Sequence, residues 1–264
     1  TMNIGFISIF ILVILLCIPV YLIYFFKLNL QHKVALAIGK AVGFLALTGI
    51  IYKLELSWNS ITFNLLLVVL LALLTAFVTI SKARFNMKKY FVPAFLSTLI
   101  VTFCLGIFVL LLIGSLVDAL EIGYLLPVAG FMAGSIIESN YKALDAYYAG
   151  LKHHRALYYY LLGNGASHNQ AVKYFVKRAL EVSVIPTLKR MSYIVIGISP
   201  IVVWAMLMLG WDIYVAILTQ LIGLAMMLSA SSLSLLLTLI IAKRYVFDAY
   251  GNLKSNEKEA KTEA

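Results

Sequence analysis

The sequence is poor in charged residues, in cysteine and in proline. Only 12% of its 264 residues are charged, against about one-quarter in a soluble domain, and 63% are hydrophobic. This composition excludes an ordinary soluble domain. Its two cysteines, Cys17 and Cys104, both lie inside apolar runs, which favours small buried hydrophobes over a disulfide or a metal site.

The sequence also lacks the motifs of several enzyme classes. It contains no Walker A phosphate-binding pattern, so we expect that this chain does not itself hydrolyse ATP. It contains no nucleophile elbow, no paired carboxylates within the apolar runs and no metal-ligand spacing. We therefore expect no catalytic residue, no metal site and no cofactor in this chain. Few charges lie deep in the apolar runs, which argues against a proton relay.

Apolar runs of about 20 residues recur along the chain, and this is the length that a helix needs to cross about 30 Å of hydrocarbon. They predict an all-α polytopic membrane protein with seven transmembrane helices. The predicted spans are 4–26, 34–52, 61–81, 91–117, 122–141, 191–209 and 213–242. They form one transmembrane domain, 1–242, which includes a cytoplasmic helical insert at 142–190. The charged tail 243–264 is expected to be disordered.

The basic residues fall on alternate connections between the predicted spans. If the first span runs from outside to inside, the cytoplasmic segments hold 19 of the 21 Lys and Arg residues, the exceptions being Lys40 and Lys53. These segments are 27–33, 82–90, 142–190 and 243–264. The predicted outer loops carry Glu55, Asp118, Glu121 and Asp212. The positive-inside rule thus predicts the N-terminus outside and the C-terminus inside, and it accounts for most of the net charge of +10 without nucleic acid.

The insert begins as a continuation of the fifth predicted span. After Glu138 the sequence ESNYKALDAYYAGLKHHRALYYYLL is expected to stay helical as far as Leu162, because it contains no proline. The tripeptide at 163–165, Gly-Asn-Gly, then supplies the left-handed conformations of a helix stop. The three tyrosines at 158–160 are typical of a membrane-interface belt or of a wall that faces a partner.

A second helix is predicted after this glycine turn. Ser167 is placed to cap it, and Gln170 lies three residues on, which is the spacing of a capping box. The helix is expected to end before Pro186. Its predicted apolar stripe consists of Ala171, Tyr174, Phe175, Ala179 and Val182, and its predicted polar face consists of Lys173, Lys177 and Arg178. A short cytoplasmic helix between two spans indicates a docking element for a soluble partner.

The insert resembles a known family. The run LLGNGASHNQAVKYFVKRALEVSVIPTLKR is similar to the coupling segment of the UPF0014 family, the FetB-like permeases of iron-export ABC transporters. That family carries a Leu-Gly-Ala-(Ser/Thr)-x-x-Gln-Ala pattern, followed by a basic helix that ends in Ile-Pro-Thr. The matching residues here are Leu162, Gly163, Ala166, Ser167, Gln170, Ala171, Arg178, Ile185, Pro186 and Thr187, with Asn164-Gly165 as a two-residue insertion.

Other segments extend the resemblance to nearly the whole chain. IGKAVGFLALTGIIYKL resembles the family's second span, with Lys40 where an arginine is usual. LLPVAGFMAGSII resembles its fifth span, and LSASSLSLLLTLIIAKR resembles its last span. The sixth span departs from the pattern, because ISPIVVWAMLMLG keeps Pro200 but lacks the glycine and the paired methionines that usually follow. The identity of the cargo therefore stays open.

The resemblance implies a permease subunit of an ATP-driven ABC transporter in the bacterial inner membrane, which exports iron or another metal ion. It implies two copies of this chain and a separate soluble ATPase that would bind ATP and Mg. The implied ATPase-coupling residues are Gly163, Ala166, Ser167, Gln170, Ala171, Lys173, Tyr174, Lys177, Arg178 and Pro186. The alternatives are an exporter of an organic or amphipathic substrate, and a stand-alone channel or ion-coupled carrier, which needs charged or broken helices near the midplane.

Two charged residues are candidates for the transport pathway. Lys40 lies about two turns into the second predicted span, where a charge is costly. Its side chain either lines the pathway, pairs with Glu138 or extends to the lipid headgroups. Glu138 ends the fifth predicted span, where it either binds a cation, pairs with Lys40 or marks the end of the span.

The seventh predicted span offers a second group of pathway candidates. They are Gln220, Met226, Met227, Ser229, Ser231 and Ser232. Small and hydroxyl residues let membrane helices approach closely and form hydrogen bonds, so helix packing is one interpretation and a polar pathway wall is the other. Gln220 is the strongest member, since a primary amide in hydrocarbon requires a hydrogen-bond partner.

Overall fold

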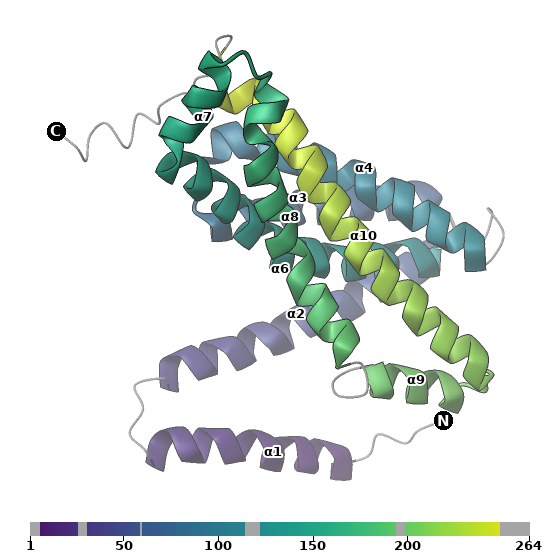
Figure 1. Cartoon of the computed structure of the whole chain (residues 1–264). Helices are drawn as coiled ribbons and strands as arrows, with labels where there is room; N and C mark the ends of the chain where they lie inside the picture. The colour runs from purple at the N-terminus through teal and green to yellow at the C-terminus, as the bar shows by residue number, and fades with distance from the viewer. Residues whose placement is uncertain (1–5, 26–30, 59, 114–121, 194–198, 249–264) are drawn as a thin grey trace. The chain divides into compact units, whose positions relative to one another are not determined.

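Figure 1 shows the computed structural model of the chain, which describes residues 6–25, 31–58, 60–113, 122–193 and 199–248. Within these ranges the regular secondary structure is α-helical, which confirms that the fold is all-α. The predicted tail beyond residue 248 and the outer-loop residues Asp118 and Glu121 lie outside the described residues.

The chain divides into two compact units, which are considered separately. The first unit, Thr1–Asn59, holds helices α1 (Phe6–Phe25) and α2 (Gln31–Trp58). The second unit, Ser60–Ala264, holds the larger helical bundle. Its described helices are α3 (Ile61–Ala83), α4 (Met87–Ile113), α6 (Ile122–His153), α7 (Arg155–Gly163), α8 (His168–Ser192), α9 (Ser199–Met208) and α10 (Ile213–Val246).

Among the residues that the structure describes, four helices are long and apolar enough to cross a membrane. The qualifying segments are Val34–Leu54 in α2, Ile61–Ala83 in α3, Met87–Val109 in α4 and Ile213–Val246 in α10. They indicate a multi-pass membrane protein. The count of seven spans and the orientation of the chain stay predictions.

Two helices of the second unit are longer than a bilayer requires. Helix α6 has 32 residues and α10 has 34, so each is about 50 Å long at 1.5 Å per residue. The hydrocarbon core of a bilayer is about 30 Å thick. A helix of this length that crosses the membrane must therefore extend beyond it, and α10 runs past the predicted end of the seventh span at residue 242 as far as Val246.

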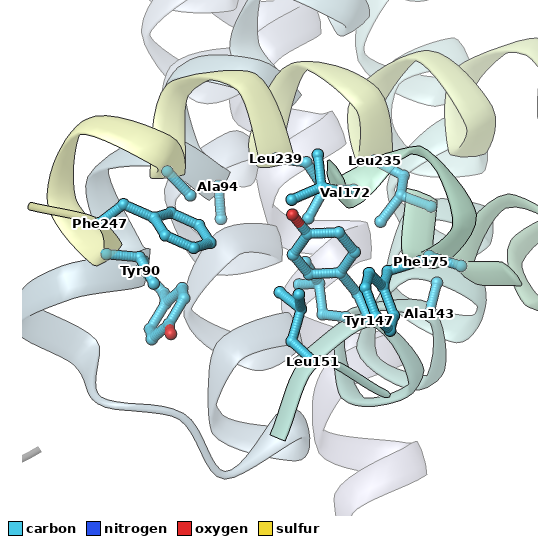
Figure 2. Close-up of a cluster of buried hydrophobic side chains, with 14 of the residues drawn as sticks. Tyr90, Ala94, Ala143, Tyr147, Leu151, Val172, Phe175, Leu235, Leu239 and Phe247 are labelled. Atoms are coloured by element: carbon cyan, nitrogen blue, oxygen red, sulfur yellow. The ribbon is translucent and has the colours of Figure 1, made fainter. Parts of the chain in front are cut away.

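The largest buried cluster lies where the ends of these helices meet. Figure 2 shows Tyr147 of α6 and Phe175 of α8 facing Leu235 and Leu239 of α10, with Tyr90 of α4 at one edge. Phe175 is 2% exposed and Tyr147 is 4% exposed. Burial of these aromatic rings contributes strongly to the stability of the fold, since each aromatic side chain removes about 150–250 Å² of its surface from solvent.

Gly150 lets α6 and α8 approach closely within this cluster. A Cβ atom at position 150 would lie 3.1 Å from Cδ1 of Phe175, which is tighter than ordinary van der Waals contact. The two helices run antiparallel over a long distance, because Gly150 lies beside Phe175 at one end and Glu138 contacts Arg190 at the other. Helix α8 is therefore attached along its length to α6.

The sequence-based prediction of one continuous helix through Leu162 is wrong. Helix α6 ends at His153, and His154 has φ −107° and ψ 36° before α7 begins at Arg155. The change of direction brings the Tyr158 side chain into the buried cluster, where it is 1% exposed. The break between the two helices thus allows this ring to be buried.

The prediction that the second helix of the insert ends before Pro186 is also wrong. Helix α8 continues through Pro186 to Ser192. Proline has no N–H to donate to the carbonyl of the residue four positions before it, here Val182, so one backbone hydrogen bond is lost. Ser183 and Thr187 on either side are 0% and 2% exposed, and this burial against the bundle holds the helix together across the gap.

Candidate functional site

The turn from α7 to α8 is built by local hydrogen bonds. Gly165 has φ +84°, its amide N–H donates to the carbonyl of Leu162 (3.0 Å), and the N–H of Ala166 donates to the carbonyl of Leu161 (3.0 Å). This pattern is a Schellman motif, which ends a helix with a residue in the left-handed region. Of the predicted Gly-Asn-Gly stop, Gly165 is the residue that adopts this conformation, and glycine does so without strain.

The predicted capping box at the start of α8 is confirmed. The side-chain Oε1 of Gln170 accepts a hydrogen bond from the Ser167 N–H (2.8 Å), and the Ser167 Oγ accepts one from the Gln170 N–H (3.4 Å). These bonds give partners to two backbone N–H groups, that of the cap residue Ser167 and that of Gln170 in the first turn, where the N–H groups have no partner within the helix. The first turn of α8 is thereby fixed although Ser167 and Gln170 are both exposed.

The first residues of α8 are also held by Tyr158 of α7 and by the end of α10. The Tyr158 hydroxyl lies 2.9 Å from Nδ1 of His168, and the ring of Phe247 packs edge-on against His168 with centroids 4.5 Å apart. Lys243 Nζ donates to Oδ1 of Asn169 (3.3 Å). Sequence analysis missed these contacts, because they join residues up to 79 positions apart only after the bundle has formed.

Burial favours the neutral forms of both Tyr158 and His168. It raises the pKa of Tyr158 to about 12 and lowers the pKa of His168, and the nearby Lys243 charge lowers the latter further. The phenol O–H of Tyr158 can therefore donate to an unprotonated Nδ1 of His168.

Helix α8 presents one buried face and one exposed face. The buried residues advance mostly in steps of four along the helix and are Ala171, Val172, Phe175, Ala179, Ser183 and Thr187. Tyr174, which the sequence placed in the apolar stripe, is 61% exposed, so that assignment is wrong. It lies on the outer face with the predicted basic residues Lys173, Lys177 and Arg178, all exposed. These four residues are here named the outer face of α8.

The outer face of α8 contains a shallow hollow between charged and apolar side chains. Its lining is Lys173, Tyr174, Val176, Lys177, Leu180, Glu181 and Val184. At its edge Glu181 pairs with Arg178, whose Nη1 lies 3.4 Å from Oε2 of Glu181, but both side chains are about half exposed or more, and such a pair contributes little stability. The two lysines, by contrast, leave positive charge on the surface beside an exposed aromatic ring.

The structure gives Glu138 a partner that the sequence did not suggest. Arg190, near the end of α8, forms an ion pair with Glu138 of α6. Both side chains are about half exposed. Lys40, the partner considered from the sequence, is an exposed residue of the first unit.

A line of hydrogen bonds joins four helices in the interior of the second unit. Asn140 of α6, 2% exposed, donates from Nδ2 to the Oγ of Ser234 on α10 (3.2 Å), and its Oδ1 accepts from the Oγ of Ser183 on α8 (3.4 Å). Thr238 Oγ1 donates to the Ser234 carbonyl (2.7 Å) and lies 2.5 Å from the Oγ of Ser97 on α4. We name this set the polar line; sequence analysis did not single out Asn140.

The pathway candidates of the seventh predicted span divide between two environments on α10. Met226, Met227 and Ser231 are buried, and the Met227 carbonyl accepts a hydrogen bond from Ser135 Oγ on α6 (3.1 Å). Gln220 is half-buried and Ser229 is exposed. The remaining candidate, Ser232, donates to the Leu228 carbonyl of its own helix (2.7 Å). The buried candidates make the contacts that are expected of residues at which helices pack together.

In the described part of the chain no group of three or more His, Cys, Asp or Glu side chains is close enough to hold a metal ion. The cysteines, expected to be buried, are both exposed on their helices. The amide of Asn64 on α3 is fully buried with neither its nitrogen nor its oxygen hydrogen-bonded.

The chain matches one family by sequence. The family described as "Uncharacterised protein family (UPF0014)" matches residues 6–247, which is most of the chain. No curated protein and no solved structure matches the chain.

Proposed function

The chain belongs to the UPF0014 family, and from this membership and the form of α8 we propose that it is the membrane-spanning subunit of an ATP-driven ABC transporter. A separate soluble ATPase would bind ATP and Mg, and this chain would supply no nucleotide site of its own. Two copies of the chain would act together in the bacterial inner membrane. The transporter would be an exporter, and iron or another metal ion would be its cargo.

The observation that carries the proposal is the two-faced construction of α8. Its inner face is packed against α6 and α10 by Ala171, Phe175 and Ala179, so a force applied to the helix would reach the bundle. Its outer face bears lysines and an exposed tyrosine, a combination that suits a protein surface with acidic groups around an apolar recess. A helix fixed on one face and open on the other is suited to transmit force from a docked partner.

The driving force would come from different contacts in the two nucleotide states of the ATPase. A ligand or partner shifts a conformational equilibrium only by its difference in affinity for the two states. If closure of the ATPase dimer moves α8, the packed inner face would carry α6 and α10 with it. The long helices that extend beyond the hydrocarbon would bring this motion into the membrane.

A charge-reversal experiment tests the docking surface. Lys173→Glu combined with Lys177→Glu reverses the free positive charge on the outer face of α8. We expect this variant to lose co-purification with the cognate ATPase and to lose stimulation of ATP hydrolysis. The matched control is Lys82→Glu with Lys88→Glu, which changes the net charge equally on exposed residues of α3 and α4. Undiminished complex formation by the α8 variant would contradict the proposal.

The cargo requires a separate experiment. The resemblance favours a metal ion, whereas the departure of the sixth predicted span around Pro200 leaves room for an organic or amphipathic substrate. Vesicles that contain the complex should be assayed for ATP-dependent movement of Fe²⁺, Mn²⁺ and Zn²⁺ and, separately, of amphipathic organic cations. Transport by this chain without any ATPase would favour the channel or carrier alternative instead.

A further inference from the structure

The polar line makes one residue a shared partner of α8 and α10. Asn140 uses its acceptor Oδ1 for Ser183 on α8 and its donor Nδ2 for Ser234 on α10. All three side chains are at most 2% exposed. In such an environment an amide that loses one bond finds no water to replace it, so breaking either bond is costly.

The position of this amide along α8 is significant. Ser183 lies about one turn before Pro186, where the backbone bond to Val182 is missing, and Arg190 contacts α6 about one turn after Pro186. Helix α8 can bend most easily at this gap. The Asn140–Ser183 bond is therefore placed where a movement of the first part of α8 would reach the rest of the bundle.

A second buried bond between the same helices provides a comparison. Ser135 of α6, 2% exposed, donates to the Met227 carbonyl of α10 (3.1 Å), about one and a half turns from Asn140 along α6. In the described part of the chain, the Ser135 side chain forms no hydrogen bond to α8. The two bonds thus differ in their connection to α8 while joining the same pair of helices.

We propose that Asn140 is a positioning residue, which passes a displacement of α8 to α10 and through Thr238 and Ser97 to α4. This inference rests on the proposed function, since it assumes that a docked ATPase moves α8. A directional bond at both ends of one short side chain fixes the spacing of α8 and α10 more narrowly than apolar packing, which tolerates sliding. Loss of the amide would leave α8 able to move while α10 stays behind.

The test follows two distances in the complex with the cognate ATPase. Spin labels on exposed positions 185 of α8 and 66 of α3 report movement of α8, and labels on exposed positions 240 of α10 and 66 of α3 report movement of α10. Both pairs are placed in a background without Cys17 and Cys104. Each distance is measured without nucleotide and with ATP bound to a hydrolysis-deficient ATPase. The variants are Asn140→Leu, the milder Ser183→Ala and Ser234→Ala, and the matched control Ser135→Ala.

In the parent and in Ser135→Ala, nucleotide should change both distances. In Asn140→Leu the first change should remain, and the second should fall by about threefold or more, as expected from a coupling free energy of typical size. If Asn140→Leu fails to fold, Ser183→Ala and Ser234→Ala must show the same selective loss. A purely structural role would lower the thermal midpoint of Ser135→Ala and Asn140→Leu alike and leave both distance changes intact.

The outcomes separate the two proposals. If the parent shows the α8 change without the α10 change, or if the Asn140 and serine variants behave as the parent does, the assignment of Asn140 is overturned while the transporter proposal survives. If nucleotide produces no change at α8 in the parent, or no ATPase binds, the proposed function itself fails and takes this inference with it.

Discussion

The two parts of α8 are attached to the bundle by different chemistry. From His168 to Val182 the inner face is held by buried aromatic and aliphatic side chains, with Phe175 at the centre. From Ser183 to Ser192 the helix is held to α6 by polar contacts. These are the hydrogen bond from Ser183 to Asn140 and the ion pair of Arg190 with Glu138. We name these parts the core part and the polar part of α8.

This difference explains how α8 can be firmly attached to the bundle and still be able to bend. Apolar burial is non-directional and is summed over many contacts, so it anchors the core part strongly but fixes its register along the neighbouring helices only loosely. Hydrogen bonds and ion pairs are few and directional, so the polar part is held in position at a few points, between which α8 can bend. Pro186, which lies in the polar part, removes a backbone bond and adds to this freedom.

The largest expected effect comes from breaking the core part. Phe175→Ala should lower the free energy of unfolding by about 3–5 kcal/mol, because it removes a fully buried ring and leaves a cavity. In thermal unfolding in lipid–detergent micelles this corresponds to a decrease of the midpoint on the order of 10 °C. Tyr174→Ala is the control, because that neighbouring ring is 61% exposed. Equal losses for the two variants would contradict the two-faced description of α8.

A smaller effect is expected at the start of the core part. Ser167→Ala removes the cap of α8 and should cost about 1 kcal/mol. Ser167→Asp should retain most of the stability, since aspartate accepts the same hydrogen bond and its charge suits a helix N-terminus. Thermal midpoints and hydrogen exchange of the first turn of α8 measure both variants. No loss in Ser167→Ala would show that Gln170 and the contacts of His168 fix this end without the cap.

The cap illustrates what could be predicted from the sequence. A capping box depends on residues three positions apart, so Ser167 and Gln170 identified it before any tertiary structure was known. The apolar runs likewise predicted an all-α membrane protein, because their length depends on the bilayer alone. Pro186 misled the prediction of the end of α8, because an isolated helix would end there but a helix buried on one face need not.

The polar contacts could not be predicted, for a physical reason. Asn140 bonds to residues 43 and 94 positions away in the chain, and Glu138 to one 52 positions away. Which polar groups meet depends on the register of antiparallel helices, and a single sequence does not specify this register. Tyr158 and Tyr160 show the same limit within one helix, since the first is 1% exposed and the second 68%.

The pH dependence of stability probes the junction of the core part with α10. Burial and the Lys243 charge lower the pKa of His168 from the 6.5 of a free histidine, so on acidification the unfolded chain binds a proton at a higher pH than the folded one. The stability that the neutral imidazole contributes is present at higher pH and is lost as pH falls below about 6.5.

The variant His168→Asn isolates this effect from the other histidines. It keeps a hydrogen-bonding group beside Tyr158 but does not titrate. The midpoint difference between wild type and variant should therefore shrink from about pH 7.5 to pH 5.5. A difference that is constant with pH would show that protonation of His168 does not oppose folding. The effect should be modest, because the imidazole is only partly buried.

The smallest effect is expected in the polar part, at the ion pair between Glu138 and Arg190. Both side chains are about half exposed, so Glu138→Gln should cost between 0 and about 1 kcal/mol, and the loss should decrease in high salt. The same pair tests where the membrane ends. If the loss reaches about 3 kcal/mol and is insensitive to salt, the pair is buried in hydrocarbon or protein, since removing one partner of a desolvated pair leaves an uncompensated charge. The predicted end of the fifth span near residue 141 would then be wrong, and the polar part of α8 would lie within the membrane.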